Sequence, residues 1–118
     1  MILVDTSVWI DHLRRGEADL VAALETDQVL VHPFVIGELA CGQLVNRQEV
    51  ISLLQALPQA PVAGEDEALA FIEARHLAGR GIGYIDVHLL ASVALHGTAR
   101  LWTRDRRLAT VAAELALT

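Results

Sequence analysis

The sequence lacks several features whose absence excludes whole classes of protein chemistry. All 9 of its Lys+Arg residues are arginine, so the chain contains no lysine. This excludes P-loop phosphate binding, Schiff-base formation and any mechanism that needs a catalytic lysine. Cys41 is the single cysteine, so no intramolecular disulfide can form. No uncharged apolar run reaches the roughly 18 residues of a membrane span, so we expect no transmembrane helix.

The start of the chain also lacks the marks of an export signal. Residues 2–4 form an apolar run that follows Met1 directly, with no basic region and no cleavable apolar segment. We therefore expect no signal peptide. Together with the single cysteine, this predicts a cytoplasmic protein.

The composition predicts a folded chain with an acidic balance. The chain has 118 residues, of which 53% are hydrophobic, so we expect one domain covering residues 1–118 with a sizeable core. The net charge of -6 is opposite to that of most nucleic-acid-binding proteins. It disfavours tight, non-specific binding of DNA or RNA. It is compatible with an enzyme whose acids are neutralised by bound cations.

Short apolar runs alternate with longer helical patterns along the whole chain. We expect strands at residues 2–4, 29–31, 61–63 and 99–103, and a terminal one near 116–117. We expect helices from the Thr6-Ser7 pair onward and at residues 18–25, 33–44, 48–57, 66–78, 85–95 and 107–115. Strands that are apolar throughout and separated by helices predict a parallel sheet covered on both faces. Ligands of such sheets bind beyond the carboxyl ends of the strands.

Two acids follow predicted strands. Asp5 comes directly after residues 2–4, and Asp105 comes after the strand near the end of the chain. Each has an ordinary alternative role, because aspartate often caps a following helix and Thr-x-Asp is a common turn. Thr6 and Ser7 are available as caps for the first helix, which leaves Asp5 free for other work.

Two further acids lie inside apolar helical stretches. At helical spacing, Glu38 shares a stripe with Val35, Leu39 and Gly42, and that stripe should face the core. A solvated glutamate at the edge of the stripe is the alternative. Asp86 heads the apolar face of the later helix, where it can also act as an N-cap and where the helix dipole favours an anion.

The four acids together suggest a cation site. Two unit charges about 4 Å apart interact by roughly 4 kcal/mol at an effective dielectric near 20, so a cluster of carboxylates repels itself. Such a cluster holds either protons at raised pKa values or a cation. An all-oxygen ligand set without a histidine–cysteine group favours Mg²⁺ (Mg2+) or Mn²⁺ over zinc.

Short motifs surround these acids at residues 4–7 (Val-Asp-Thr-Ser), 36–39 (Ile-Gly-Glu-Leu), 84–91 (Tyr-Ile-Asp-Val-His-Leu-Leu-Ala) and 101–105 (Leu-Trp-Thr-Arg-Asp). Taken in order, they resemble the PIN-domain ribonucleases, and more narrowly the VapC-type toxins of toxin–antitoxin systems. The resemblance covers essentially the whole chain. It implies a three-layer α/β/α sandwich around a mainly parallel sheet, which agrees with the α/β class predicted from the apolar pattern.

The resemblance also implies roles for individual residues. The catalytic and metal-binding quartet would be Asp5, Glu38, Asp86 and Asp105. The hydroxyl positions beside it are Thr6, Ser7 and Thr103. Glu38 would bind the ion directly or through water, and would orient or deprotonate the attacking water.

The function implied by the resemblance is that of a toxin. It would be a Mg²⁺-dependent endoribonuclease that hydrolyses RNA phosphodiester bonds, is inhibited by a cognate VapB-type antitoxin, forms a homodimer and involves no membrane. Arginine suits phosphate contact, so candidate RNA contacts are Arg104, Arg106 and Arg80.

Two other functional classes remain open at this point. A phosphate-accepting signalling domain also gathers acids around Mg²⁺, but it needs a lysine that this chain lacks. A non-catalytic PIN-like RNA-binding or scaffolding module is the alternative that keeps the fold, although an intact acid quartet disfavours it. The five histidines have no zinc-site spacing, and we expect most to be surface or structural. Cys41 is expected to be a packed thiol, and Trp9 and Trp102 to be core or interface aromatics.

Overall fold

Three short parallel strands form the centre of the molecule. The computed structural model describes all 118 residues. The strands are β1 (Ile2–Val4), β2 (Val29–Leu30) and β3 (Arg100–Trp102), and their order in the sheet is β2-β1-β3. Leu3 of β1 is paired with Leu30 on one side and with Leu101 on the other. The first strand of the chain is therefore the central strand of the sheet.

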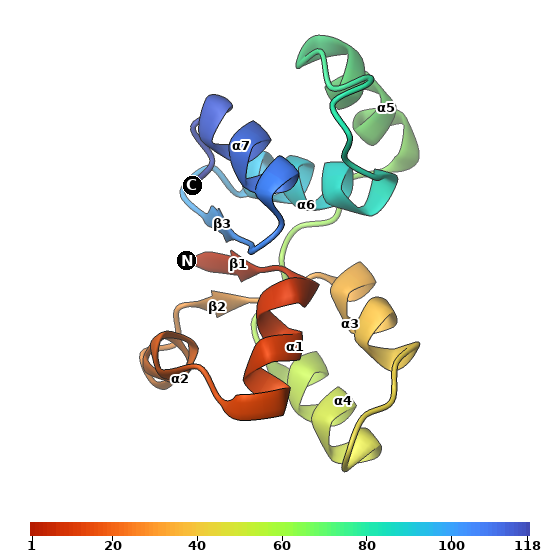
Figure 1. Cartoon of the computed structure of the whole chain (residues 1–118). Coiled ribbons are helices and arrows are strands. Elements are labelled where there is room, and N and C mark those ends of the chain that lie inside the picture. The colour runs from red at the N-terminus through yellow and green to blue at the C-terminus, as the bar shows by residue number, and fades with distance from the viewer.

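Seven helices surround this sheet. They are α1 (Thr6–Arg15), α2 (Ala18–Glu25), α3 (Pro33–Ala40), α4 (Arg47–Ala56), α5 (Glu65–Ala74), α6 (Tyr84–His96) and α7 (Arg106–Glu114). In Figure 1, α1 to α4 lie toward β2, and α5 to α7 gather toward β3. The predicted three-layer α/β/α arrangement around a parallel sheet is confirmed. No helix combines the length and the apolar character that crossing a bilayer requires.

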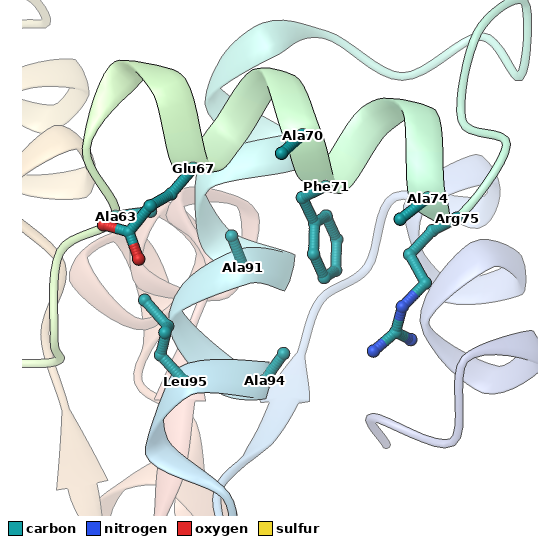
Figure 2. Close-up of a pocket in the computed structure, with 9 residues that line it drawn as sticks. All are labelled: Ala63, Glu67, Ala70, Phe71, Ala74, Arg75, Ala91, Ala94 and Leu95. Atoms are coloured by element: carbon teal, nitrogen blue, oxygen red, sulfur yellow. The ribbon is translucent and has the colours of Figure 1, made fainter.

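Helix α5 packs on α6. An open hollow of about 380 Å³ lies between them, lined mostly by hydrophobic side chains that include alanines of both helices. Figure 2 shows Phe71 of α5 pointing toward α6 inside this hollow, with Glu67 and Arg75 near its ends. None of the four candidate acids lines it, so this hollow lies outside the predicted site.

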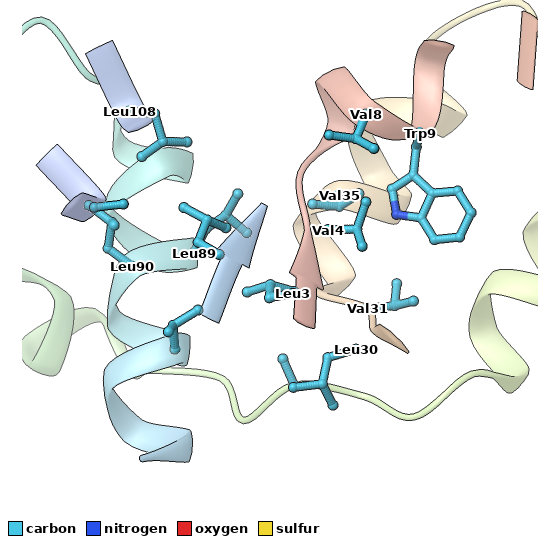
Figure 3. Packing of buried hydrophobic residues seen from close by; sticks show 14 of the residues in the cluster. Leu3, Val4, Val8, Trp9, Leu30, Val31, Val35, Leu89, Leu90 and Leu108 are labelled. Atoms are coloured by element: carbon cyan, nitrogen blue, oxygen red, sulfur yellow. The ribbon is translucent and has the colours of Figure 1, made fainter. Parts of the chain in front are cut away.

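The core is built around the central strand. Leu3 and Val4 are both completely buried, and successive side chains of a strand point to opposite faces. In Figure 3, Leu3 points toward Leu89 of α6 and Val4 toward Val35 of α3. Full burial of one such side chain stabilises the fold by about 1.5–3 kcal/mol. Because β1 carries core residues on both faces, its carboxyl end at Asp5 is held in a well-packed position.

Helix α6 is the most buried helix, and it carries Asp86 near its start. Every residue from Val87 to Val93 is buried. A helix that is apolar on all sides belongs in the interior, and α6 packs against both α5 and β3. This burial fixes the position of its first turn, where Tyr84 is exposed to solvent.

One predicted strand is wrong. Residues 61–63 form no strand, and the parallel pairing at this edge is a single bridge between Val31 and Gln59. The N–H of Val31 donates to the carbonyl of Pro58 (2.9 Å), and the N–H of Ala60 donates back to Val31 (2.9 Å). Pro61 has no N–H, so it cannot extend this ladder. The predicted terminal strand near 116–117 is also absent.

Two predicted helices end early. Helix α3 ends at Ala40 rather than at residue 44, and the Arg47 guanidinium donates to the carbonyls of Ala40 and Gly42. Carbonyls at a helix end need such partners, so Arg47 favours termination there. Helix α5 ends at Ala74 rather than at residue 78. His76 has φ +54°, a left-handed conformation that no helix can contain. Cys41, expected to be packed, is exposed.

Candidate active site

Asp5 is the most firmly held of the four acids. It is only 6% exposed, at the point where β1 ends and α1 begins. Its Oδ1 accepts a hydrogen bond from the backbone N–H of Thr6 (2.8 Å). Its Oδ2 accepts from the hydroxyls of Ser7 (2.9 Å) and Thr103 (2.6 Å). Three donors therefore fix the carboxylate, and charge-assisted hydrogen bonds of this kind are the stronger ones.

The prediction that Thr6 or Ser7 caps α1 is wrong. Asp5 itself is the N-cap, with extended backbone angles (φ −72°, ψ 157°) and a side chain that accepts from the first turn. The two hydroxyl residues lie inside the helix, which leaves their side chains free to bond carboxylates. Capping and site formation are thus combined in Asp5 rather than divided among the three residues.

The end of β3 is fastened to the start of α1 by hydroxyl groups. Thr103 Oγ1 donates to Asp5 and accepts from the backbone N–H of Asp105 (3.1 Å). Ser7 Oγ accepts from the backbone N–H of Arg104 (3.0 Å). Asp105 then caps α7, because its Oδ1 accepts from the N–H of Leu108 (3.0 Å). Parallel neighbouring strands thus bring Asp5 and Asp105 to one edge of the sheet, as their order in the sequence predicts.

Glu38 joins this edge through Thr6. The Thr6 hydroxyl donates to Glu38 Oε1 (2.7 Å), while the Thr6 backbone N–H donates to Asp5. One residue therefore bridges the two acids. Val35 and Leu39 of the predicted stripe are buried, but Glu38 is exposed at its edge. The expectation that Glu38 itself faces the core is wrong, because the stripe is too narrow to include it.

Asp86 is the fourth acid and is half-buried in the first turn of α6. Its Oδ2 accepts from the backbone N–H of Gly83 (3.0 Å), which closes the turn before the helix. Burial raises the pKa of Asp86, the Gly83 bond opposes that rise, and the negative charges of Asp5, Asp105 and Glu38 raise the pKa further. The four acids therefore occupy one electrostatic site, although they come from four separate segments.

No basic side chain forms an ion pair with this cluster. The ion pairs of the molecule use Asp11, Glu17 and Glu114, and none of them includes an acid of the quartet. Glu38, Asp86 and Asp105 each keep one carboxylate oxygen to which no protein group donates a hydrogen bond. These oxygens are available to a ligand from solution.

The donor set suits a hard cation that keeps part of its water shell. All candidate ligand atoms are oxygens, which favours Mg²⁺ or Mn²⁺. No three of these acids stand close enough together to hold an ion with their side chains alone. Mg²⁺ commonly binds one or two carboxylates, several waters and a substrate phosphate, so it does not require a closed cage.

The predicted RNA-contact arginines differ in their availability. The guanidinium of Arg104 donates to Asp11 and to Glu17 (2.8 Å). These hydrogen bonds lower the pKa of both carboxyls and raise the pKa of Arg104. Arg80 is similarly paired with Glu114 (2.7 Å). Arg106 is exposed and takes part in no ion pair, so it is the freest of the three predicted contacts.

A group of aromatic rings lies beside the acids and is not predicted from the sequence. His32 and His88 are buried at 0% and 2% exposure, and Phe34 and Tyr84 cover them. The Nδ1 of His32 accepts from the N–H of Phe34 (2.9 Å) and caps α3. The structural role expected for most histidines holds for these two. Two spacings in the sequence could have pointed to this group, because Phe34 lies four residues before Glu38 and Tyr84 lies four residues before His88.

Comparison with known proteins agrees with the geometry. The family model described as "PIN domain" matches residues 2–114. The chain is 54% identical over 114 residues to Ribonuclease VapC32 of Mycobacterium tuberculosis, in strains CDC 1551 / Oshkosh and H37Rv. The match covers 97% of this chain and 92% of each relative. The chain therefore belongs to the PIN-domain family, and its relatives within that family are VapC-type ribonucleases.

Proposed function

We propose that this protein is the toxin of a type II toxin–antitoxin system and that it acts as a Mg²⁺-dependent endoribonuclease in the cytoplasm. The observation that carries the proposal is the acid quartet. Four carboxylates share one edge of the sheet, none of them is in an ion pair, and three of them keep a free oxygen. The 54% identity to a protein named Ribonuclease VapC32 supports RNA as the substrate.

The residues proposed to hold the ion are Asp5, Asp86 and Asp105, with Glu38 directly or through water. Because no three of these acids stand close enough together to bind one ion directly, part of this set would act through waters bound to the ion. When bound, the ion supplies a Lewis acid that activates water and offsets the charge on the phosphoryl oxygens. Mn²⁺ would serve in the same place, because it is also a hard cation with a preference for oxygen ligands.

Glu38 is the proposed general base. Its Oε1 is held by Thr6, and its exposed Oε2 remains free to accept a proton from the attacking water. The water oxygen bonds to phosphorus, the bond from phosphorus to the 3′ oxygen breaks, and the leaving oxygen takes a proton from solvent. Proton transfer to a positioned carboxylate typically contributes about 10²–10⁴-fold to a rate.

Asp5 has a different role because it is already fully oriented. Thr6, Ser7 and Thr103 hold both of its oxygens, so the carboxylate cannot rotate away when substrate arrives. A fixed, negatively charged group gains more from a cation than a mobile one does, because no ordering cost remains. The hydroxyls therefore act as positioning groups.

The proposed partners are a cognate VapB-type antitoxin and a second copy of the chain. A groove of about 430 Å³ runs beside Glu38, and Val45 at its edge is 85% exposed. Ile10 and Leu13 of α1 contribute apolar wall to the same groove. An antitoxin segment with apolar side chains and an arginine would match both the wall and the Glu38 carboxylate.

The test is a cleavage assay on a mixed RNA pool. Purified protein is incubated with and without Mg²⁺ or Mn²⁺, and the cut ends are mapped. We expect cleavage only with the metal, and none from Asp5→Asn, which keeps the shape of the side chain but removes its charge. RNA binding without metal-dependent cleavage would instead favour the non-catalytic module. Full activity of Asp5→Asn would refute the assignment of the site.

A further inference from the structure

Four aromatic rings form a compact group next to the acid quartet. We call His32, Phe34, Tyr84 and His88 the aromatic cluster. The His88 ring lies at its centre, with ring centroids 4.8 Å from Phe34 and 4.6 Å from Tyr84, both edge-on. The His32 ring is 4.9 Å from Phe34. These distances are those of favourable aromatic pairs.

The cluster has one side buried in the protein and one side exposed to solvent. His32 and His88 are almost completely buried, whereas Phe34 is 37% and Tyr84 47% exposed. A single exposed aromatic ring is ordinary on a protein surface. These two are distinguished because both rest on the same buried imidazole, so neither is free to fold away from solvent. The pair is therefore a rigid apolar surface.

This surface adjoins the acids through the two helices that carry it. Phe34 lies four residues before Glu38 on α3, and residues at that spacing share one helix face a turn apart. Tyr84 opens α6 two residues before Asp86, whose carboxylate is bonded to Gly83 directly ahead of Tyr84. The Phe34 ring of α3 also contacts the His88 ring of α6, so the exposed rings lie where the helices that carry Glu38 and Asp86 meet.

The charge balance adds a reason for a non-ionic contact here. The chain has a net charge of -6, and Arg104 and Arg80 are bonded to its own carboxylates. Phosphate contacts alone would leave RNA weakly held by so acidic a protein. Stacking of bases on aromatic rings needs no positive charge and tolerates any base.

We propose that Phe34 and Tyr84 form a stacking platform for unpaired bases of the RNA substrate. This inference rests on the proposed function and adds to it two residues that would hold the bases of the substrate. Bases in a duplex already stack on their neighbours, so a paired segment offers no free face to these rings. His88 supports the platform from below and does not contact RNA itself.

Binding is measured with the Asp5→Asn protein, which cuts no RNA and is called the parent below. The probe is a single-stranded oligoribonucleotide with one 2-aminopurine, a base whose fluorescence is quenched by stacking. Phe34→Leu and Tyr84→Leu remove the rings, and Tyr84→Phe and Phe34→Tyr retain them. Phe71→Leu, which removes the ring in the hollow between α5 and α6, is the matched control.

We expect each leucine variant to bind the single strand about tenfold more weakly and to lose quenching. The ring-retaining variants and Phe71→Leu should behave like the parent, and duplex RNA should bind equally to all. Unchanged affinity and quenching in folded leucine variants would overturn the platform. So would a change of oligomeric state with RNA affinity unchanged, because the rings would then contact a second copy.

The two proposals fail separately. Suppose that the parent binds the probe more tightly than the leucine variants do, but that the unsubstituted protein cuts no RNA with any metal. The platform then stands and the nuclease proposal fails. If the unsubstituted protein cuts RNA while the leucine variants bind normally, only the platform fails. A parent that binds no RNA at all overturns the platform as well.

Discussion

Thr103 donates a 2.6 Å hydrogen bond to Asp5 from a position 98 residues later in the chain. The contact exists because β1 and β3 are parallel neighbours, paired from Ile2 opposite Arg100 to Val4 opposite Trp102. Parallel pairing brings the residues after both strands to the same edge of the sheet. The orientation of Asp5 is therefore determined as much by β3 as by its own strand.

Replacing Thr103 by valine should separate activity from stability. Thr103→Val keeps the branched shape but leaves Asp5 Oδ2 with Ser7 as its only donor. We expect cleavage to fall about 10–100-fold, as for other groups that orient a metal ligand, and stability to fall by about 1–2 kcal/mol. Rates on RNA and urea unfolding measure the two effects. Thr110→Val, which removes an exposed hydroxyl bonded to Arg106 O, is the control and should retain full activity.

Neutralising Asp86 should relieve repulsion in the metal-free protein. Asp86→Asn keeps an oxygen that can accept from Gly83 but removes one charge from the cluster. We expect the variant to be at least as stable as the unsubstituted protein in EDTA, and inactive with Mg²⁺. Excess Mg²⁺ should stabilise only the unsubstituted protein, by about 2.7 kcal/mol at a hundredfold excess over Kd. Thermal unfolding with and without metal measures this, and equal stabilisation of both proteins would contradict it.

His32 should make the fold sensitive to mild acid. Burial, and secondarily the neighbouring His88, lower the pKa of His32 from 6.5 to about 4. The unfolded chain takes up this proton below about pH 6.5, whereas the folded protein resists it until about pH 4. Stability is therefore complete above about pH 6.5 and is lost as the pH falls toward about 4, by about 3 kcal/mol.

Urea unfolding at a series of pH values from about 7 down to about 4 measures the effect of His32, because this interval spans its unfolded and folded pKa values. His32→Asn keeps an oxygen that can cap α3 through Phe34 N–H but cannot titrate, so its stability should vary less with pH. His76→Asn is the control, because His76 is exposed at φ +54°, where asparagine is well tolerated. Equal pH profiles for the two variants would rule out His32 as the sensitive group.

Arg106 should contribute more to RNA binding than Arg104. Each phosphate contact to a single strand adds roughly 0.7 to the slope of log K against log salt. We expect Arg106→Gln to lower that slope by about this amount. Arg104→Gln should leave it nearly unchanged, because that guanidinium is held by Asp11 and Glu17. Titrations of inactive Asp5→Asn protein with RNA at several salt concentrations make the comparison, and the reverse order of effects would refute it.

The sequence predicts the sheet and the location of the acids because both depend on local pattern. Apolar runs mark β1 and β3, and parallel strands place Asp5 and Asp105 at a shared edge. Strand 61–63 was wrongly predicted from its apolar run, although Pro61, which cannot donate to a ladder, already argued against a strand there. Whether Glu38 is exposed depends on the width of the contact between α1 and α3. Helical spacing in the sequence does not give that width.

Side-chain pairs that do not follow from strand order could not be predicted from the sequence. Arg104 bonds to Asp11 across 93 residues, and nothing near either residue signals the pair. The only sequence signal for Arg104 is its position beside Asp105, which favours an RNA contact over a structural ion pair. The aromatic cluster was missed for a similar reason, because its rings come from two helices that meet only in the fold.

The central place of β1 has a consequence for the order in which the site forms. Asp5, which directly follows β1, leaves the ribosome well before β3 and Thr103, which complete its surroundings. A growing chain therefore has no finished acid edge until β3 has emerged and paired with β1.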